Sequence, residues 1–146
     1  MAAERTAEVV WQGGLAKGSG RFTTGSGAIG EHEVTWASRT ERSEGRTSPE
    51  ELIAAAHASC FAMALSGVLT DGGNEPDGLT ITATCTFDQV GDGMGITTMQ
   101  LDVRGRVPGL DEGGVAEAVS AAEQSCPVSN ALRGNVDMSV DAQLEA

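Results

Sequence analysis

Apolar and polar residues alternate along the first third of the chain, in three short stretches separated by glycines. The stretches read TAEVVWQGG, SGRFTTGSG and EHEVTWASRT. Alternation with a period of two is typical of strands in a half-buried antiparallel sheet, and the intervening glycines suit tight turns. The pattern therefore predicts a three-stranded meander.

The pattern changes at TSPEEL, where a long apolar segment begins. Thr47 or Ser48 can cap a helix, Pro49 is favoured at a first helical position, and the two glutamates that follow complement the positive helix N-terminus. The helix is expected to continue through LIAAAHASCFAMALSGVL to about Thr70, where DGGNEPDG ends it. Because this helix is apolar almost all round, we expect it to be buried on every side.

The rest of the chain contains further strand and helix patterns. LTITATCTFDQV and GITTMQLDVRGRV read as a hairpin joined by the turn GDGMG. One face of the first of these strands carries Ile81, Ala83, Cys85 and Phe87. DEGGVAEAVSAAEQS predicts an amphipathic helix, CPVSNALRG a short helix and NVDMSVDAQLE a closing strand. This order predicts an α+β fold rather than a doubly wound sheet.

Length and charge limit the classes of function. A chain of 146 residues suggests one domain, spanning residues 1–146. With 21 acidic against 9 basic residues, the chain lacks the basic surface that nucleic acid or an anionic membrane requires. We expect its longest apolar run to be too short to span a bilayer, and MAAERTAEVVW lacks the features of a secretory signal. A cytoplasmic location is therefore expected.

Three cysteines carry the candidate chemistry. In a reducing compartment they do not predict a structural framework, since disulfides that persist there are usually catalytic. Cys126 directly precedes a proline at a predicted helix start, where free backbone N–H groups and the helix dipole favour a thiolate. Cys60 lies in mid-helix, and its position alone leaves a small buried hydrophobe and a reactive thiol equally open. Cys85 is assigned to core packing.

Other kinds of site are also open at this point. His57 lies three residues before Cys60 on the same helical face, as in a cysteine hydrolase whose base is histidine, although a space-filling histidine is the simpler interpretation. A zinc site made by these two residues with Cys85 and Cys126 lacks paired ligand spacing, so we expect no metal. GSGRFTTGSG lacks the P-loop pattern, and we expect no bound cofactor. A non-catalytic dimeric module whose cysteines only pack is a further alternative.

Three segments together resemble the osmotically inducible protein C and organic hydroperoxide resistance family (OsmC/Ohr), and its OsmC branch most closely. They are VVWQGGLAKGSGRFTTGSG, TSPEELIAAAHASCFAMALS and SCPVSNAL, and the similarity extends over essentially the whole chain. Members of the family are thiol-dependent peroxidases that reduce organic hydroperoxides. The resemblance implies an OsmC-like α+β fold, an intertwined homodimer with antiparallel sheets wrapped around long central helices, and a role in peroxide stress.

The resemblance also implies roles for individual residues. Cys60 matches the peroxidatic cysteine, Cys126 the resolving cysteine and Glu50 an acidic partner. Arg39 matches the arginine of the OsmC branch, with Arg21, Arg42 and Arg46 as alternatives. Elementary chemistry agrees, because a thiol with a pKa of about 8.5 is mostly protonated at neutral pH and a guanidinium favours its thiolate. A carboxylate such as that of Glu50 can hold the guanidinium bidentately.

Substrate, reductant and assembly are also expected from these features. The apolar neighbours Ile53, Phe61, Met63 and Leu65 favour alkyl or lipid hydroperoxides over hydrogen peroxide. Without a redox cofactor, electrons must come from an external dithiol, and the resemblance implies a dihydrolipoyl group on a reductant protein or lipoyl domain. Glu50 and Cys60 are ten residues apart on one predicted helix, about 15 Å along its axis. Two antiparallel copies of the helix in a homodimer would bring Glu50 of one subunit toward Cys60 of the other.

Overall fold

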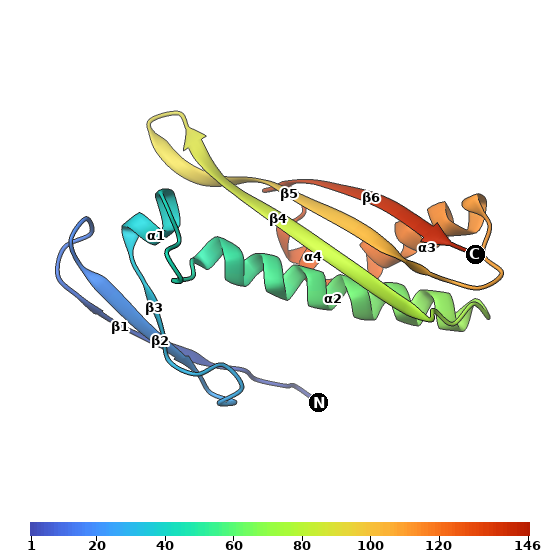
Figure 1. The fold of residues 1–146 in the computed structure, drawn as a ribbon, viewed down its shortest axis with the longest axis horizontal. Coiled ribbons are helices and arrows are strands. Elements are labelled where there is room, and N and C mark those ends of the chain that lie inside the picture. The colour runs from blue at the N-terminus through green and yellow to red at the C-terminus, as the bar shows by residue number, and fades with distance from the viewer. The chain divides into compact units, whose positions relative to one another are not determined.

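The computed structural model describes residues 1–146. Its elements are β1 (Ala7–Gln12), β2 (Ser19–Thr24), β3 (His32–Val34), α1 (Trp36–Thr40), α2 (Pro49–Asp71), β4 (Gly78–Val90), β5 (Gly93–Arg106), α3 (Glu112–Ser125), α4 (Pro127–Leu132) and β6 (Asp137–Glu145) (Figure 1). They form two compact units, an N-terminal unit of residues Met1–Leu52 and a C-terminal unit of residues Ile53–Ala146. The α+β class is confirmed, and the single domain stays a prediction.

The N-terminal unit contains the predicted meander, an antiparallel sheet in the order β1-β2-β3. The third strand was predicted too long. In the structure, β3 ends at Val34, and the chain then forms α1. Thr35 caps this helix: its hydroxyl accepts from the backbone N–H of Ser38, and the Ser38 hydroxyl accepts from the N–H of Thr35, both at 3.0 Å. These two reciprocal hydrogen bonds form a capping box, which favours a helix after Thr35 even though the alternating pattern there favours a strand.

The outer strand of this sheet is exposed on both faces. Val9 and Val10 are each 57% exposed and Trp11 is 41% exposed, so the expected half-burial is not found in the chain by itself. Trp11 pairs with Gly20 on β2, where a Cβ atom would lie 2.8 Å from the indole ring. Glycine is therefore needed there to let the indole lie across the neighbouring strand.

Helix α2 has the boundaries that the sequence predicts. The hydroxyl of Ser48 accepts from the N–H of Glu51 at 3.2 Å, so Ser48 is the cap and Pro49 occupies the first helical position. At the other end, Gly73 has a φ of +85°, and the N–H of Asn74 donates to the carbonyl of Leu69 at 2.8 Å. A left-handed glycine with this hydrogen bond ends the helix.

The expectation that α2 is buried on every side is wrong for the single chain. Phe61 and Leu65 are fully buried and Leu69 is 3% exposed, but Met63 is 74% exposed on another side of the helix. The exposed positions of the mid-helix surface are Ala55, Ala56, Ser59, Met63 and Gly67. This small, mostly apolar set is called the open face of α2 below.

The expectation that no apolar run is long enough to span a bilayer is also wrong. By length and composition, the 23 residues of α2 are sufficient, with a mean hydropathy of 1.8 in the most apolar stretch. One such helix is weak evidence, since core helices of water-soluble proteins share both properties. Phe61 and Leu65 belong to one cluster with side chains of β5 and α3, so one side of α2 packs against the sheet and α3.

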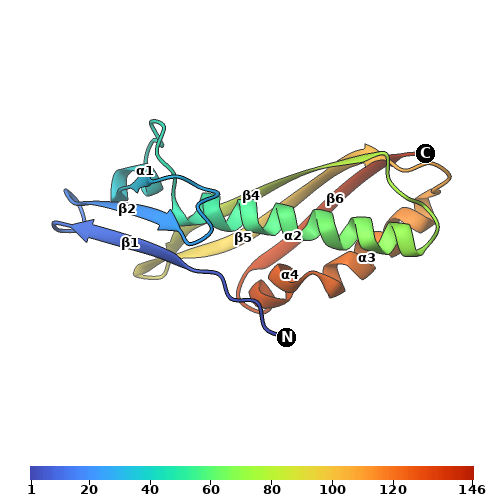
Figure 2. The same ribbon diagram turned by 90° about the horizontal axis from the view of Figure 1, so that it is seen from below.

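The C-terminal unit is a sheet in the order β4-β5-β6 with helices on one face (Figure 2). β4 and β5 form the predicted antiparallel hairpin, and Gly91 in its turn has a φ of +59°. β6 pairs with β5 in parallel, so the expectation of antiparallel sheets fails for this pair. The cause is the crossover through α3 and α4, which returns the chain in the direction of β5.

The core of this unit lies between the sheet and the helices. Leu101 and Val103 of β5 face Phe61 and Leu65 of α2 and Ala122 of α3 within one buried cluster. Full burial of a Leu, Val or Phe side chain contributes roughly 2 kcal/mol. Cys126 belongs to the same buried cluster, so its thiol packs within the core.

Candidate active site

Two cysteines that are far apart in the sequence meet in the C-terminal unit. The Sγ atom of Cys60, in the middle of α2, lies 3.3 Å from the Sγ atom of Cys126, between α3 and α4. The disulfide bond is about 2.05 Å long, so the two groups are thiols in contact. Cys126 is fully buried, whereas Cys60 is half-buried. Only a small movement separates this arrangement from a disulfide, and solvent reaches Cys60 first.

Cys126 lies at the cap of α4, with Pro127 at the first helical position as predicted. Burial raises the pKa of Cys126, but the hydroxyl of Ser129, backbone N–H groups of Ser129 and Val128, and the Cys60 thiol together lower its pKa below the ordinary value. The cysteine side chain makes no cap hydrogen bond of regular geometry. The N–H groups therefore act on the sulfur mainly as dipoles at a helix start.

The pKa of Cys60 moves in the opposite direction. Burial is the largest cause that raises it, the neighbouring Cys126 raises it further, and the backbone N–H of Val128 offsets only part of this. Within one chain, Cys126 is thus the more acidic thiol and Cys60 the more accessible one. A cation near Cys60 would be required to make it a thiolate at neutral pH.

The N-terminal unit joins two other predicted site residues in a bidentate ion pair. The Nε atom of Arg39 lies 3.0 and 3.1 Å from the two carboxylate oxygens of Glu50, and Nη2 lies 2.7 Å from Oε1. The Glu50 side chain is 7% exposed and that of Arg39 is 30% exposed. The guanidinium also lies 5.8 Å from the ring centroid of Trp36. A nearly buried carboxylate thus holds a partly accessible guanidinium in a fixed orientation.

The alternative arginines are placed differently. Arg21 pairs with Glu31 and Glu33, and Arg46 pairs with Glu33. These ion pairs are largely exposed and stabilise the chain little. Arg42 is exposed as well. Of the four candidates, Arg39 is the one that the structure brings to Glu50.

His57 is directed toward Ser129 rather than toward Cys60. Its Nε2 atom lies 2.7 Å from the Ser129 hydroxyl, both side chains are buried, and its Nδ1 atom has no hydrogen-bond partner. The Cys60–His57 pair of a hydrolase is therefore not formed. Sequence reasoning did not select Ser129, although it stands in the quoted segment SCPVSNAL. No group of three or more potential metal ligands gathers in the chain, and Cys85 lies half-buried on β4.

Burial lowers the pKa of His57 below its ordinary value of 6.5. The unfolded chain therefore binds a proton at this residue more readily than the folded chain does. The stabilising contribution is fully present above pH 6.5 and is lost as pH falls through the lowered pKa. We expect the free energy of unfolding, measured in urea, to decrease with acidification in this range. In the His57→Asn variant, the part of this decrease in unfolding free energy that His57 causes should be absent. The matched change at the exposed residue His32, His32→Asn, should leave the decrease as it is in the wild type.

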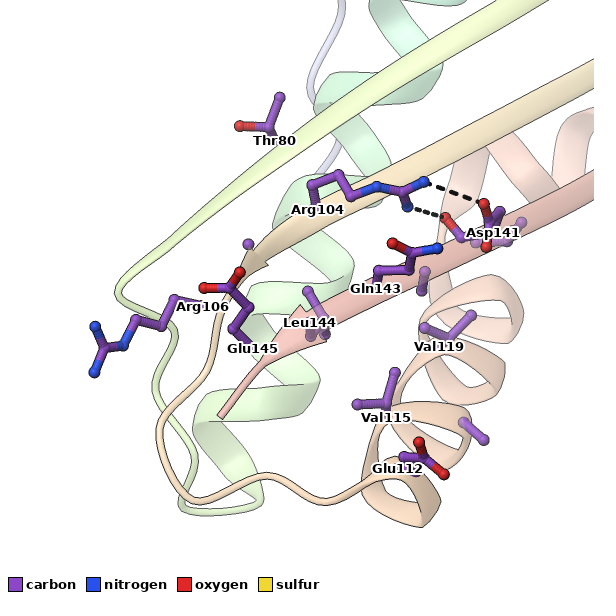
Figure 3. Close-up of a pocket in the computed structure, with 14 residues that line it drawn as sticks. Thr80, Arg104, Arg106, Glu112, Val115, Val119, Asp141, Gln143, Leu144 and Glu145 are labelled. Carbon is purple, nitrogen blue, oxygen red and sulfur yellow. Dashed lines mark hydrogen bonds and ion pairs between the residues drawn. The ribbon is translucent and has the colours of Figure 1, made fainter.

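A large cavity of the C-terminal unit holds none of these residues. It has a volume of about 990 Å³ and lies between the end of the sheet and α3 (Figure 3). Val115 and Val119 form its apolar side, and Arg104 is held there by Asp141 with an Nη2–Oδ2 distance of 3.2 Å. The two cysteines lie elsewhere, so size alone does not identify the candidate site.

Comparison with known proteins identifies relatives of this chain. The family described as OsmC-like protein matches residues 42–141. Peroxiredoxin OsmC of Escherichia coli is 35% identical over the full length of both chains. The organic hydroperoxide resistance protein of Xanthomonas axonopodis pv. citri is 37% identical over 95 residues, which are 64% of this chain and 65% of the relative.

Solved structures show the same fold. The organic hydroperoxide resistance protein OhrB of Bacillus subtilis has a TM-score of 0.74 at 31% identity, covering 94% of this chain and 98% of that one. An OsmC-like protein of Mycoplasma pneumoniae has a TM-score of 0.76 at 14% identity over both full chains, which shows the fold alone. Since the family match covers more than half of the chain and a full-length relative shares a third of its residues, this protein belongs to the OsmC/Ohr family.

Proposed function

We propose that the protein is a thiol-dependent peroxidase that reduces organic hydroperoxides to alcohols and so acts in peroxide detoxification. The contact of 3.3 Å between the sulfur atoms of Cys60 and Cys126 carries this proposal. Relatives named peroxiredoxin OsmC and organic hydroperoxide resistance protein support the same reaction class. A packing role alone does not require two oxidisable thiols in contact.

The proposed reaction uses the two thiols in sequence. The Cys60 thiolate attacks one peroxide oxygen, the O–O bond breaks, and the alcohol leaves after taking up a proton. Cys60 is then a sulfenic acid. The sulfur of Cys126 attacks it, the S–S bond forms, the S–O bond breaks, and water leaves. The half-buried Cys60 suits the first role because the peroxide must reach it, and the fully buried Cys126 suits the second.

The first step requires a cation that stabilises the Cys60 thiolate, since burial raises its pKa. We assign this role to Arg39, which Glu50 orients. A guanidinium can both favour the thiolate and hold the peroxide by hydrogen bonds. Glu50 and Cys60 are ten residues apart on α2, about 15 Å along the axis of an α-helix. A second subunit is therefore the proposed source of the Arg39–Glu50 pair at each Cys60.

The same homodimer would cover surfaces that the single chain exposes. The open face of α2 is made of alanine, serine and glycine with the 74% exposed Met63, and small side chains permit close approach of a second helix. Val9 and Trp11 on β1 are exposed as well. Exposed apolar surface on this scale is typical of an interface.

The surroundings of Cys60 favour an apolar substrate. Of the four apolar neighbours considered above, Phe61 and Leu65 are fully buried in the core, whereas Ile53 is half-buried and Met63 is exposed. Ile53 and Met63 are therefore the ones available to contact an alkyl group. We propose that alkyl or lipid hydroperoxides are preferred to hydrogen peroxide.

One experiment tests the proposed function against a non-catalytic module. The reduced protein is treated with one equivalent of cumene hydroperoxide and its intact mass and thiol content are measured. We expect a loss of two hydrogen atoms and two thiols per chain, with a Cys60–Cys126 bond in the peptide map. Unchanged mass and thiols would support the module instead. Equal or faster reaction with hydrogen peroxide would contradict the substrate preference.

We further propose that an external dithiol, a dihydrolipoyl group in particular, reduces the enzyme in a reducing cytoplasm, without a bound cofactor or metal. A vicinal dithiol can open the Cys60–Cys126 disulfide through a mixed disulfide and then close on itself. We expect dihydrolipoamide to sustain turnover of cumene hydroperoxide. Turnover with thioredoxin and its reductase, but not with dihydrolipoamide, would overturn this assignment.

A further inference from the structure

We propose that Ser129 and His57 form a proton path that removes the thiol proton of Cys126 when this cysteine resolves the sulfenic acid. The proposal rests on the two-cysteine function given above and concerns only its second step. Ser129 is the third residue of α4, whose cap is Cys126. His57 acts through Ser129 as a positioning and proton-accepting residue.

The three side chains are buried, and they lie on one turn of α4 and the helix that packs against it. Cys126 and Ser129 are the cap and third residues of α4, one helical turn apart, and the N–H of Asn130 donates to the carbonyl of Cys126 at 3.0 Å. His57 reaches this turn from α2, with its Nε2 atom 2.7 Å from the Ser129 hydroxyl. The exposed fractions are 0% for Cys126, 2% for Ser129 and 1% for His57. Bulk water therefore does not take the Cys126 proton directly.

The donors and acceptors of Cys126, Ser129 and His57 allow a proton to pass from the thiol to the imidazole. A serine hydroxyl has one proton to donate and can accept at its oxygen. With neutral His57, the hydroxyl of Ser129 donates to Nε2 and its oxygen can accept from the thiol. After transfer, Nε2–H donates to Ser129 and the Ser129 hydroxyl donates to the Cys126 thiolate. The second arrangement agrees with the lowering of the Cys126 pKa by the Ser129 hydroxyl.

The other nitrogen of His57 provides the exit. Nδ1 has no hydrogen-bond partner in the chain, although the ring is buried. His57 lines a cavity of about 180 Å³ together with the charged side chains of Glu123 from α3 and Arg133 after α4, and with Leu101, Ser129, Met138, Ser139 and Val140. A polar cavity of this size is large enough to admit water. The proposed exit for the proton is from Nδ1 through this cavity, whose lining includes the carboxylate of Glu123.

The resolving step balances as follows. The Cys126 proton passes to Ser129 as the Ser129 proton passes to Nε2, and one proton leaves His57 by way of Nδ1. The Cys126 sulfur forms the S–S bond, the S–O bond of the Cys60 sulfenic acid breaks, and the leaving hydroxide takes one proton from solvent to become water. The hydroperoxide consumed in the first step is the only oxidant.

The test separates the two chemical steps. Reduced protein is mixed with one equivalent of cumene hydroperoxide, and the sulfenic acid, trapped with dimedone, and the disulfide are followed by quenched-flow mass spectrometry. His57→Gln keeps a donor near the Nε2 position but cannot take up a proton, and Ser129→Ala breaks the path. We expect both to slow disulfide formation at least about tenfold, as for a lost acid–base group, while sulfenic acid forms within about twofold of the wild-type rate.

Two further variants and a titration distinguish proton transfer from a structural effect. Ser129→Thr keeps the hydroxyl and should resolve at the wild-type rate. Ser26→Ala, which removes an exposed hydroxyl in the turn after β2 that accepts from the N–H of Ala28, should change neither step. In a Cys60→Ser background, the thiolate absorbance of Cys126 should titrate at higher pH when His57→Gln or Ser129→Ala is added.

These experiments distinguish a failure of the proton path from a failure of the proposed peroxidase function. If the wild-type protein consumes no hydroperoxide or forms no disulfide, the proposed function itself fails. If it forms the disulfide and His57→Gln and Ser129→Ala do so equally fast, the proton path is wrong. Slower resolution with an unchanged titration of Cys126 would also overturn it, because that result is expected of a purely structural role.

Discussion

Cys60→Ser is expected to lower the rate of reaction with cumene hydroperoxide at least about a thousandfold, because a serine hydroxyl remains protonated where the thiolate attacks. Cys126→Ser is expected to stop the reaction halfway. That variant should consume one equivalent of hydroperoxide per chain at nearly the wild-type rate, and dimedone should then trap a sulfenic acid at Cys60. Peroxide consumption and intact mass, measured on the same samples, check both results.

The matched control is Cys85→Ser. Cys85 lies half-buried on β4 and is not assigned to either step, so this variant should consume hydroperoxide and form the disulfide as the wild type does. The reverse assignment would make Cys126 the cysteine that attacks the peroxide. A physical argument exists for it, since within one chain Cys126 is the thiol with the lowered pKa. Trapping of a sulfenic acid at Cys126 in the Cys60→Ser variant would establish that reversal.

The roles proposed for the two cysteines follow their accessibility rather than the direction of their pKa shifts. Cys126 has the more favourable local electrostatics but is fully buried, whereas Cys60 is half-buried and needs a cation. A hydroperoxide must touch the sulfur that it oxidises. A thiolate that no substrate reaches can attack only a neighbour, and the neighbour of Cys126 is Cys60, 3.3 Å away.

The sequence predicts the elements around these residues well where one local signal dominates. Ser48, Pro49 and the glycines after Asp71 determine the ends of α2, and the structure places them as expected. The third strand was predicted too long because two signals compete at Thr35. The alternating pattern continues past it, but the hydrogen bonds between Thr35 and Ser38 begin a helix.

Pairings between distant segments were harder to predict. The approach of Cys126 to Cys60 was expected only through the family resemblance, because residues 66 positions apart in the chain share no local signal. The contact between His57 and Ser129 was not expected at all. Composition predicted that α2 is apolar on all sides, but it could not distinguish a side covered by the sheet from a side that the single chain leaves exposed.

That open side leads to the prediction of a shared active site, which two inactive variants can test together. Cys60→Ser lacks the attacking thiol, and Glu50→Ala leaves the Arg39 guanidinium without the carboxylate that holds it at 2.7 Å, so activity should fall to at most about a tenth. Each variant should still dimerise through the open face of α2. The two are mixed in equal amounts, unfolded, refolded together and assayed with cumene hydroperoxide.

If each site combines Glu50 of one subunit with Cys60 of the other, a heterodimer holds one site in which both residues are intact. Random pairing makes half of the dimers heterodimers, so the mixture should regain about a quarter of the wild-type activity. The matched control mixes Cys60→Ser with Cys126→Ser. These two cysteines touch within one chain, so every heterodimer lacks a complete pair, and the mixture should show no turnover beyond the single equivalent that Cys126→Ser consumes. A protein that light scattering shows to be monomeric at micromolar concentration would contradict the shared site. So would two variants that dimerise but regain nothing when mixed, because each Cys60 would then depend on Glu50 of its own chain.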